Sequence, residues 1–401
     1  MALNIDRLAA ADEFIADTYL DGGVLPGFSW AVLHDGDMVH VSHLNYEPDS
    51  IFRIYSMTKP ITSVGMLRLI EQGHCRLNDP VHKWLPGWED LRVYVSGSQK
   101  SMATTAAERP MTVRDLLTHT GGLTYGWMET NPVDAVYRDR EIGSRSVPLD
   151  ETCARLAEVP LLFSPGTGWQ YSISTDVIGH LIELISGQAL DEYLADHILA
   201  PLNMADTAFW VDDAKAARLV PNTALADQSP FGIPDDPVPS GIGDLVIVDD
   251  NNAQSEFRSR PAMLSGGGGL TSTLADYARF CQMVLNGGEL EGARILGAQT
   301  VSFAGLNHLP GGGTLADLGP PISSETNNDG MGFGLGFSVV VDPVANGVIQ
   351  SVGNLAWGGA ASTLFWIDPA ERLAVVGMTQ VMPSWSTNLR DELRQIVYSC
   401  L

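Results

Sequence analysis

Strand patterns lie near both ends of this 401-residue sequence, and helix patterns fill most of the stretch between them. Near the start, Asp35-Gly36 separates two apolar runs, which is the strongest short signal for a β-hairpin and predicts one over residues 28–42. Near the end, turn signals separate four expected strands: 337–341, 348–352, 362–367 and 373–379. This order predicts an α+β fold in which one antiparallel sheet is built from both ends of the chain.

Amphipathic helices are expected over residues 5–20 and 386–398, where they would cover this sheet. Residues 75–210 show a mostly helical pattern, with a capping signal at Thr112 and Asp115. We therefore expect a helical lobe inserted between the two sheet-forming segments. The buried face of the first helix is predicted to consist of Ile5, Leu8, Ala9, Phe14 and Ile15.

Two stretches rich in Gly, Pro, Asp and Asn, residues 211–265 and 308–332, are expected to be long loops. Between them, Thr273 with Asp276 predicts the start of another helix. The chain is accordingly predicted to form two domains. Residues 1–57 together with 268–401 would make an α/β domain, and residues 58–267 a mainly helical domain with long loops.

The charge balance narrows the range of partners. Lys and Arg total 23 against 48 Asp and Glu, a formal net charge of −25, which disfavours nucleic acid and anionic membranes as partners. The four cysteines are scattered without a C-x-x-C pair, so free thiols are expected rather than disulfides or a zinc site. The sequence shows no signal peptide and no apolar run of membrane-spanning length, which predicts a cytoplasmic protein.

A short motif supplies the candidate chemistry. Ser56 and Lys59 are three residues apart, a spacing that places both side chains on one helix face. Pro60 is tolerated only in the first turn of a helix, so the helix is expected to begin near Ser56. A serine beside an amine that can take up its proton is an activated nucleophile. The motif alone is weak, since a capping serine followed by a surface lysine would look the same.

Further motifs make the pattern specific. The chain resembles the class C β-lactamase-related group, with its penicillin-binding-protein-like fold, and most closely the family VIII carboxylesterases. The resemblance covers nearly the whole length and rests on the order of five motifs: Ser56-Met57-Thr58-Lys59, Leu116-Leu117-Thr118-His119-Thr120-Gly121-Gly122-Leu123, Pro165-Gly166 followed by Trp169-Gln170-Tyr171-Ser172, Gly267-Gly268-Gly269-Leu270 with Asp276, and Trp357-Gly358-Gly359.

The resemblance implies roles for individual residues. Ser56 would be the nucleophile, and Lys59 and Tyr171 would share the work of general acid and base. The backbone N–H groups of Ser56 and Ala360 would form the oxyanion hole. The expected substrate-binding residues are Trp357, Gly358, Gly359, Tyr125 and Ile173, with Trp127 as a further wall. His119 and His180 are expected on helices as structural histidines, and no cofactor or metal is implied.

Two departures from the β-lactamase pattern favour esters as substrates. Ile173 stands where β-lactamases carry an asparagine that binds the amide side chain of a β-lactam. Trp357 stands where they carry a lysine that binds the substrate carboxylate, and it offers apolar area instead. The glycines that follow are expected to let a ligand approach the strand backbone. We therefore expect a serine carboxylesterase that hydrolyses short-chain esters through an acyl-serine.

Other functions remain open from the sequence. On the same fold, a β-lactamase, a D-amino-acid peptidase or an acyltransferase would use the same residues. A non-catalytic ligand binder is disfavoured because Ser56, Lys59 and Tyr171 are all present. An α/β-hydrolase is disfavoured because the sequence lacks a G-x-S-x-G motif. The natural ester, the acyl chain length and the oligomeric state are left open.

Overall fold

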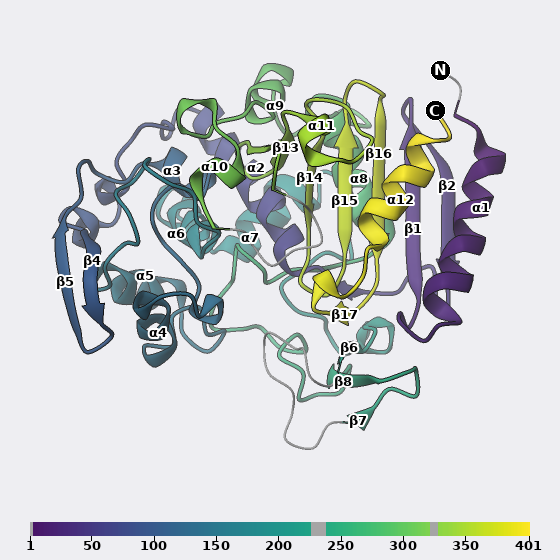
Figure 1. Ribbon diagram of the computed structural model, residues 1–401, viewed down its shortest axis with the longest axis horizontal. Helices are drawn as coiled ribbons and strands as arrows, with labels where there is room; N and C mark the ends of the chain where they lie inside the picture. Colours follow the sequence, from purple (N-terminus) through teal and green to yellow (C-terminus); the bar gives the residue numbers. More distant parts are fainter. Residues whose placement is uncertain (1–2, 226–237, 321–327) are drawn as a thin grey trace.

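The computed structural model describes residues 3–225, 238–320 and 328–401. Its centre is a seven-stranded sheet with the strand order β12-β13-β14-β15-β16-β1-β2 (Figure 1). All neighbouring strands are antiparallel, and β1 from the predicted hairpin pairs with β16 from the C-terminal part. The strands are β1 (Phe28–His34), β2 (Asp37–Leu44), β12 (Met331–Phe333), β13 (Ser338–Val340), β14 (Leu355–Gly358), β15 (Leu364–Asp368) and β16 (Leu373–Met378).

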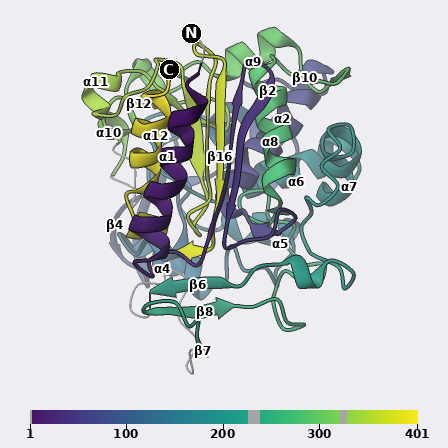
Figure 2. The same ribbon diagram turned by 90° about the vertical axis from the view of Figure 1, so that its right-hand side faces the viewer.

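The terminal helices cover one face of this sheet. α1 (Ile5–Ile15), continued by a π-helical turn over Ala16–Leu20, lies beside α12 (Leu389–Tyr398), and the two chain ends are neighbours (Figures 1 and 2). The predicted buried face of the first helix is partly wrong. Leu8 and Ile15 are buried, but Ile5 and Ala9 face solvent and Phe14 is half-buried. The sheet instead covers the stripe that contains Ala11, one turn from Leu8.

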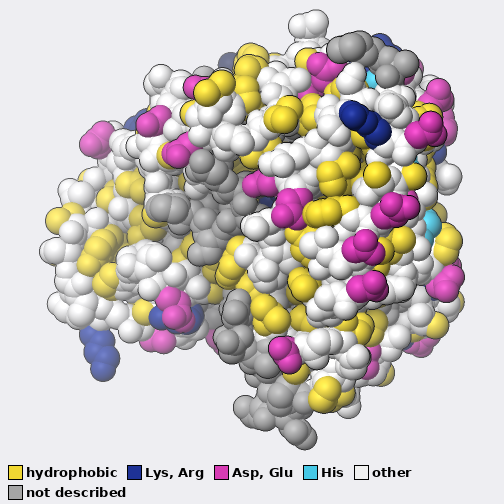
Figure 3. Space-filling view, turned by 45° about the vertical axis from the view of Figure 1, so that its right-hand side comes forward, with side chains coloured by type: hydrophobic (Ala, Val, Ile, Leu, Met, Phe, Trp, Pro, Cys, Tyr) yellow, Lys and Arg dark blue, Asp and Glu magenta, His cyan; other side chains and the backbone are white. Residues whose placement is uncertain are grey.

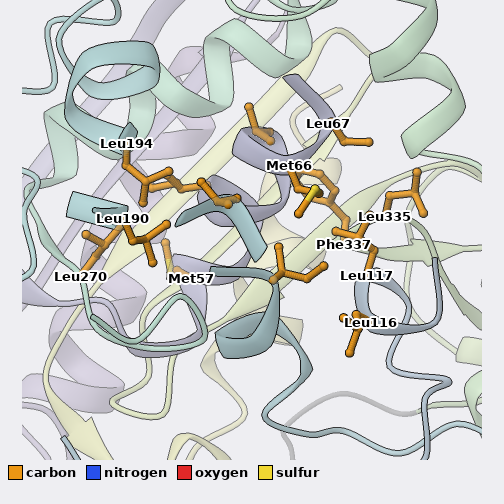
Figure 4. Close-up of a cluster of buried hydrophobic side chains, with 14 of the residues drawn as sticks. Met57, Met66, Leu67, Leu116, Leu117, Leu190, Leu194, Leu270, Leu335 and Phe337 are labelled. Carbon is orange, nitrogen blue, oxygen red and sulfur yellow. The ribbon is translucent and has the colours of Figure 1, made fainter. Parts of the chain in front are cut away.

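Helices α8 (Leu274–Leu285) and α2 (Thr58–Glu71) lie on the opposite face (Figure 2). α8 begins at the predicted Thr273 cap and contacts β1, β15 and β16. α2 is buried along most of its length, as its apolar sequence predicts, and contacts α6 and α7. Figure 4 shows buried side chains of the surrounding core: Met57, Met66, Leu67, Leu116, Leu117, Leu190, Leu194, Leu270, Leu335 and Phe337.

The middle of the chain forms the expected group of helices. The predicted capping box of Thr112 and Asp115 is present at the start of α3. One segment contradicts the helical expectation, because β4 (Arg92–Ser98) and β5 (Ser101–Ala106) form a largely exposed hairpin with its turn at Gln99 and Lys100. The helices are α3 (Val113–Leu117), α4 (Pro132–Asp139), α5 (Leu149–Ala157), α6 (Ser174–Ser186) and α7 (Leu190–Leu194), which a π-helical turn over Ala195–Leu199 extends.

The first expected long loop contains strands. β6 (Asn222–Leu225), β7 (Val238–Pro239) and β8 (Leu245–Asp249) join β17 (Val381–Met382) in a small sheet at the bottom of Figure 1. The partner of β6, β17, is distant in sequence, so local patterns gave no sign of this sheet. Residues 226–237 of this loop lie outside the described residues, as do 321–327 of the second, which carries the short helix α10 (Leu315–Leu318).

The strand expected over residues 348–352 is also wrong. Asp342 caps the short helix α11 (Pro343–Asn346), and a loop follows in which Ile349 and Val352 are 65% and 64% exposed. The strand is β14 instead, which places Trp357 within the sheet. The remaining elements are β3 (Phe52–Arg53), β9 (Thr271–Ser272), β10 (Glu289–Leu290), β11 (Ala293–Arg294) and α9 (Ala298–Ala304). The division into two domains stays a prediction.

Acidic side chains are spread over the face that carries α1 and α12, and basic side chains are few there (Figure 3). This is how the net charge of −25 is distributed on that side of the molecule. Across the described ranges, no helix combines the length and the apolar character that crossing a bilayer would require. In the same ranges, no three His, Cys, Asp or Glu side chains are grouped so that they could hold a metal ion.

Candidate active site

Ser56 lies in a tight helical turn, Tyr55–Met57, immediately before α2 begins at Thr58. The residue before it, Tyr55, has a φ of 42°, a left-handed conformation that is costly for a residue with a side chain. Neighbours hold this conformation: Asn222 Nδ2 donates to the Tyr55 hydroxyl at 3.0 Å, and the Tyr55 ring contacts Phe257. The turn presents Ser56 to a cavity of about 860 Å³.

Three predicted residues meet at the hydroxyl of Ser56. Lys59 Nζ lies 3.1 Å from Ser56 Oγ, and the Tyr171 hydroxyl donates to the same oxygen at 2.5 Å. Tyr171 lies in the short loop before α6, as the sequence indicated. Lys59 is 2% exposed, and its Nζ also donates to the Gly267 carbonyl at 2.7 Å. The nitrogen lies 4.5 Å from the Tyr171 ring centroid and 5.6 Å from that of Tyr125, within cation–π range.

A buried carboxylate that the sequence analysis missed supports this arrangement. Asp176, in the first turn of α6, accepts hydrogen bonds from Ser265 Oγ at 2.5 Å and from the Gly267 N–H at 3.1 Å. Burial raises the pKa of its carboxyl group, and hydrogen bonds and the charge of Lys59 partly offset this. An acid in the first helical turn was the available signal, but the same signal occurs at Asp115 and Asp276.

Ala360 follows β14 and lies in the cavity wall with Ser56. Within the described residues, neither the Ser56 N–H nor the Ala360 N–H has a protein hydrogen-bond partner. The glycines before Ala360 are closely packed by protein atoms. A Cβ at Gly358 would lie 1.9 Å from an Arg390 nitrogen, and one at Gly359 would lie 2.5 Å from the Ile54 carbonyl oxygen. On the side where a Cβ would point, the glycines therefore admit neighbouring protein groups, and the approach of a ligand to the strand backbone stays a prediction.

Aromatic rings form much of the cavity wall beside Tyr171. Its ring centroid lies 5.4 Å from that of Tyr125 and 5.4 Å from that of Trp357, and Trp127 stacks on Tyr125. Burial raises the pKa of the Tyr125 phenol well above its usual value, with Tyr171 and Asp176 adding to the shift, so Tyr125 stays neutral. The predicted binding residues Tyr125, Ile173, Trp357, Gly358 and Gly359 all line the cavity.

Comparison with known proteins identifies the family. The profile of the family described as Beta-lactamase matches residues 13–398. The chain belongs to the Beta-lactamase family. It is 32% identical over 358 residues to Esterase EstB of Burkholderia gladioli, with 88% of this chain and 83% of that protein covered. It is 30% identical over 381 residues to Protein Rv1367c of Mycobacterium tuberculosis (strain ATCC 25618 / H37Rv), with 92% and 89% covered.

The fold of this Beta-lactamase family member is also that of a solved structure. The structure described as EstCE1, a hydrolase with promiscuous acyltransferase activity, matches with a TM-score of 0.80 at 24% identity and covers 98% of this chain and 99% of that one. The predicted fold is confirmed, as is the resemblance to the family VIII esterases. The prediction of an enzyme among the β-lactamase-fold serine hydrolases is confirmed with it.

The cavity of this Beta-lactamase family member also contains charged groups that the sequence analysis did not single out. Arg390 and Arg394 of α12 are 7% and 2% exposed and line the cavity. They adjoin the buried stripe of that helix, which contains Leu389 and Leu393, and an arginine so placed was a detectable signal. Arg145, also in the wall, lies over the Phe257 ring at 4.1 Å. The cavity thus has an aromatic part beside Tyr171 and a charged part elsewhere.

The two histidines considered from sequence have structural partners. His119 is not on a helix as expected; it follows α3 with a φ of 57°, and its Nδ1 lies 3.1 Å from Ser172 Oγ. Burial, with a smaller contribution from the charge of Lys59, lowers the pKa of His119 well below its usual value. His180 is on α6, where its Nδ1 lies 3.0 Å from a carboxylate oxygen of Glu183.

Proposed function

We propose that this protein is a serine carboxylesterase that hydrolyses short-chain carboxylic esters through an acyl-serine intermediate. The observation that carries the proposal is the position of Ser56 Oγ, which has Lys59 Nζ at 3.1 Å and the Tyr171 hydroxyl at 2.5 Å. A serine hydroxyl with two such partners at the wall of an 860 Å³ cavity is arranged as an activated nucleophile. Membership of a family with Esterase EstB among its relatives supports the same reaction.

In the proposed reaction, Lys59 acts as a neutral amine and accepts the Ser56 proton as Oγ attacks the ester carbonyl carbon, and the Tyr171 hydroxyl relays a proton between Lys59 and the leaving group. The carbonyl oxygen becomes an oxyanion, which the N–H groups of Ser56 and Ala360 would stabilise. Removing one such donor typically costs about 2.7–4 kcal/mol of barrier. The proton then passes to the leaving alcohol, and the same groups deprotonate the water that releases the acid and regenerates Ser56.

The substrate class is proposed from the wall beside Tyr171. Trp357 presents an indole ring there, and Ile173, 1% exposed, supplies no hydrogen-bonding group. A neutral ester can be bound by such a wall without burying an unpartnered charge. An aromatic wall also suits an apolar alcohol, so acyl transfer from Ser56 to an alcohol is the second candidate. Adding an alcohol to the hydrolysis reaction and measuring the new ester would separate the two.

The proposal can be tested by covalent labelling and turnover. A p-nitrophenyl ester of a short-chain acid should be hydrolysed by the wild-type protein and by Ser63→Ala, which changes a buried serine of α2 outside the cavity wall. Ser56→Ala should lose this activity and keep its fold. A fluorophosphonate should add covalently to the peptide that contains Ser56. An unlabelled protein, or activity of Ser56→Ala within a few-fold of wild type, would overturn the proposal.

A further inference from the structure

We propose that Asp176 is a positioning residue that fixes the amine of Lys59 through the backbone of Gly267, an inference that rests on the proposed function. The carboxylate does not contact Ser56. It acts on the segment that supplies a backbone acceptor to Lys59. Its role is to hold the base at hydrogen-bonding distance from the nucleophile.

Lys59 needs such support because its amine lies at the end of a chain with several rotatable bonds. Its Nζ has two protein acceptors, Ser56 Oγ at 3.1 Å and the Gly267 carbonyl at 2.7 Å. The shorter of these contacts is to the backbone. The place of the Gly267 carbonyl therefore decides where the amine sits relative to Ser56.

Gly267 lies in Ser265-Gly266-Gly267-Gly268-Gly269, a sequence with little conformational preference of its own. Two helices hold it. From α2, Thr62 Oγ1 donates to the Gly266 carbonyl at 2.8 Å. From α6, Asp176 Oδ1 accepts from both Ser265 Oγ and the Gly267 N–H. Without the carboxylate, α6 loses both of these anchors on the segment.

The segment around Gly267 has no room for side chains. A Cβ at Gly267 would lie 2.4 Å from Asp176 Oδ2, and a Cβ at Gly266 would lie 2.7 Å from the Thr175 carbonyl oxygen. The absence of side chains lets the segment pass directly against the first turn of α6. Asp176, 3% exposed, lies at that contact and places its carboxyl group near the Lys59 side chain.

Asp276 provides a matched control in the same chain. It has the same position in α8 that Asp176 has in α6, and it accepts from Thr207 Oγ1 at 2.9 Å and from the Asp206 N–H at 2.8 Å. It is 7% exposed, and burial raises the pKa of its carboxyl group too. It does not line the cavity. Replacing either aspartate with alanine therefore removes the same kind of contact, but only Asp176 supports Lys59.

The test compares Asp176→Ala with Asp276→Ala in the full chain. A p-nitrophenyl ester is the substrate, kcat is expressed per serine that a fluorophosphonate labels, and the melting temperature is recorded. We expect Asp176→Ala to lower kcat about 10²-fold, the usual cost of displacing a reacting group by an ångström, with little change in KM. Asp276→Ala should keep kcat per labelled site within about threefold of wild type, even where it melts earlier.

A second pair of variants covers the case in which Asp176→Ala does not fold. Ser265→Ala removes one hydrogen bond to the carboxylate and should lower kcat, whereas Ser265→Thr keeps the hydroxyl and should restore it. Equal kcat in the two aspartate-to-alanine variants, or in the two Ser265 variants, would overturn the positioning role. Absence of hydrolysis by the wild-type protein would instead overturn the proposed function.

Discussion

The indole ring of Trp357 lies 5.4 Å from the phenol ring of Tyr171, measured between centroids, with 52° between the ring planes. This contact puts a large apolar surface next to the Ser56 hydroxyl, to which Tyr171 donates at 2.5 Å. A substrate bound at Ser56 is therefore expected to lie beside Trp357. We predict that this ring favours uncharged groups on this side of the cavity.

Esters are expected to be better substrates than β-lactams. We predict that kcat/KM for short-chain aryl esters exceeds that for penicillins or cephalosporins by at least about 10², or roughly 2.7 kcal/mol of transition-state binding. The reason is that Ile173 supplies no hydrogen bond to the amide group of a lactam, and Trp357 supplies no positive charge to its carboxylate. Both substrate classes should be measured on one preparation, and Trp357→Lys should narrow the gap.

Arg390 acts against this prediction, because it places a positive charge in the cavity wall next to Gly358, and a positive charge attracts the carboxylate of a lactam. Turnover of a cephalosporin equal to that of the esters would show that the argument from Ile173 and Trp357 is wrong. In that case Arg390→Gln should selectively lower cephalosporin turnover, whereas Arg390→Lys, which keeps the positive charge, should lower it less.

Lys59 and Tyr171 are expected to act as one unit. Lys59→Ala and Tyr171→Phe should each lower kcat by roughly 10²–10⁴, the range for losing general acid–base catalysis. Since both groups share the Ser56 proton, the double variant should lose much less than the product of the two effects. Steady-state kinetics of the four proteins would measure this. A harmless Lys59→Ala together with a damaging His119→Gln would indicate a serine–histidine mechanism instead.

His119 is expected to make the folded protein less stable in acid. Burial holds the pKa of its imidazole well below the usual value, so the folded protein keeps His119 neutral. The unfolded chain takes up a proton at this position below about pH 6.5. Because only the unfolded state binds that proton, the free energy of unfolding falls with decreasing pH, by at most about 1.4 kcal/mol per pH unit from this residue.

Denaturant unfolding at about pH 7 and about pH 5, of wild type and of His119→Gln, would test this contribution. Buried Asp176 and Asp276 have raised pKa values and change stability in the opposite sense. Only the difference between the two proteins isolates the histidine. The variant should lose less stability on acidification than the wild type, and identical losses would contradict the assignment.

Gly359 is expected to be intolerant of a side chain. In Gly359→Ala the new Cβ would lie 2.2 Å from Thr363 Oγ1 and 2.5 Å from the Ile54 carbonyl oxygen, so the strand end must shift. We predict a loss of about 1–3 kcal/mol in stability, as for other overpacked sites, and lower kcat because the Ala360 N–H moves. Gly87→Ala, where the nearest atom is 3.7 Å away, should change neither unfolding nor turnover.

Sequence reasoning succeeded where the signal was local. The Asp35-Gly36 turn, the caps at Thr112 and Thr273, and the spacing of Ser56 and Lys59 each depend on neighbours within a few residues. Tyr171 was found only through the order of family motifs, because no local pattern links it to a serine 115 positions away. Its hydrogen bond exists only once the chain is folded.

The failures involve distant partners. The strand β6 pairs with β17, which lies near the other end of the chain, and an apolar run at 348–352 proved to be an exposed loop. Arg390 was missed because it reaches the cavity from the last helix. Asp176 was missed for a different reason. In the sequence, an acid in the first turn looks the same whether it only stabilises the N-terminus of the helix or also anchors a glycine-rich segment that contacts a lysine.

A ribosome that makes this chain releases β1 early, but β16, its partner in the sheet, only after residue 378 has been added. Until then the hairpin of β1 and β2 has an open edge, which is a template for incorrect strand pairing. Ala360 emerges late as well, so a nascent chain carries Ser56 and Lys59 long before the other side of the site exists. Activity should therefore appear only near the end of synthesis, and a chaperone bound to the edge of β1 would raise the yield of folded enzyme.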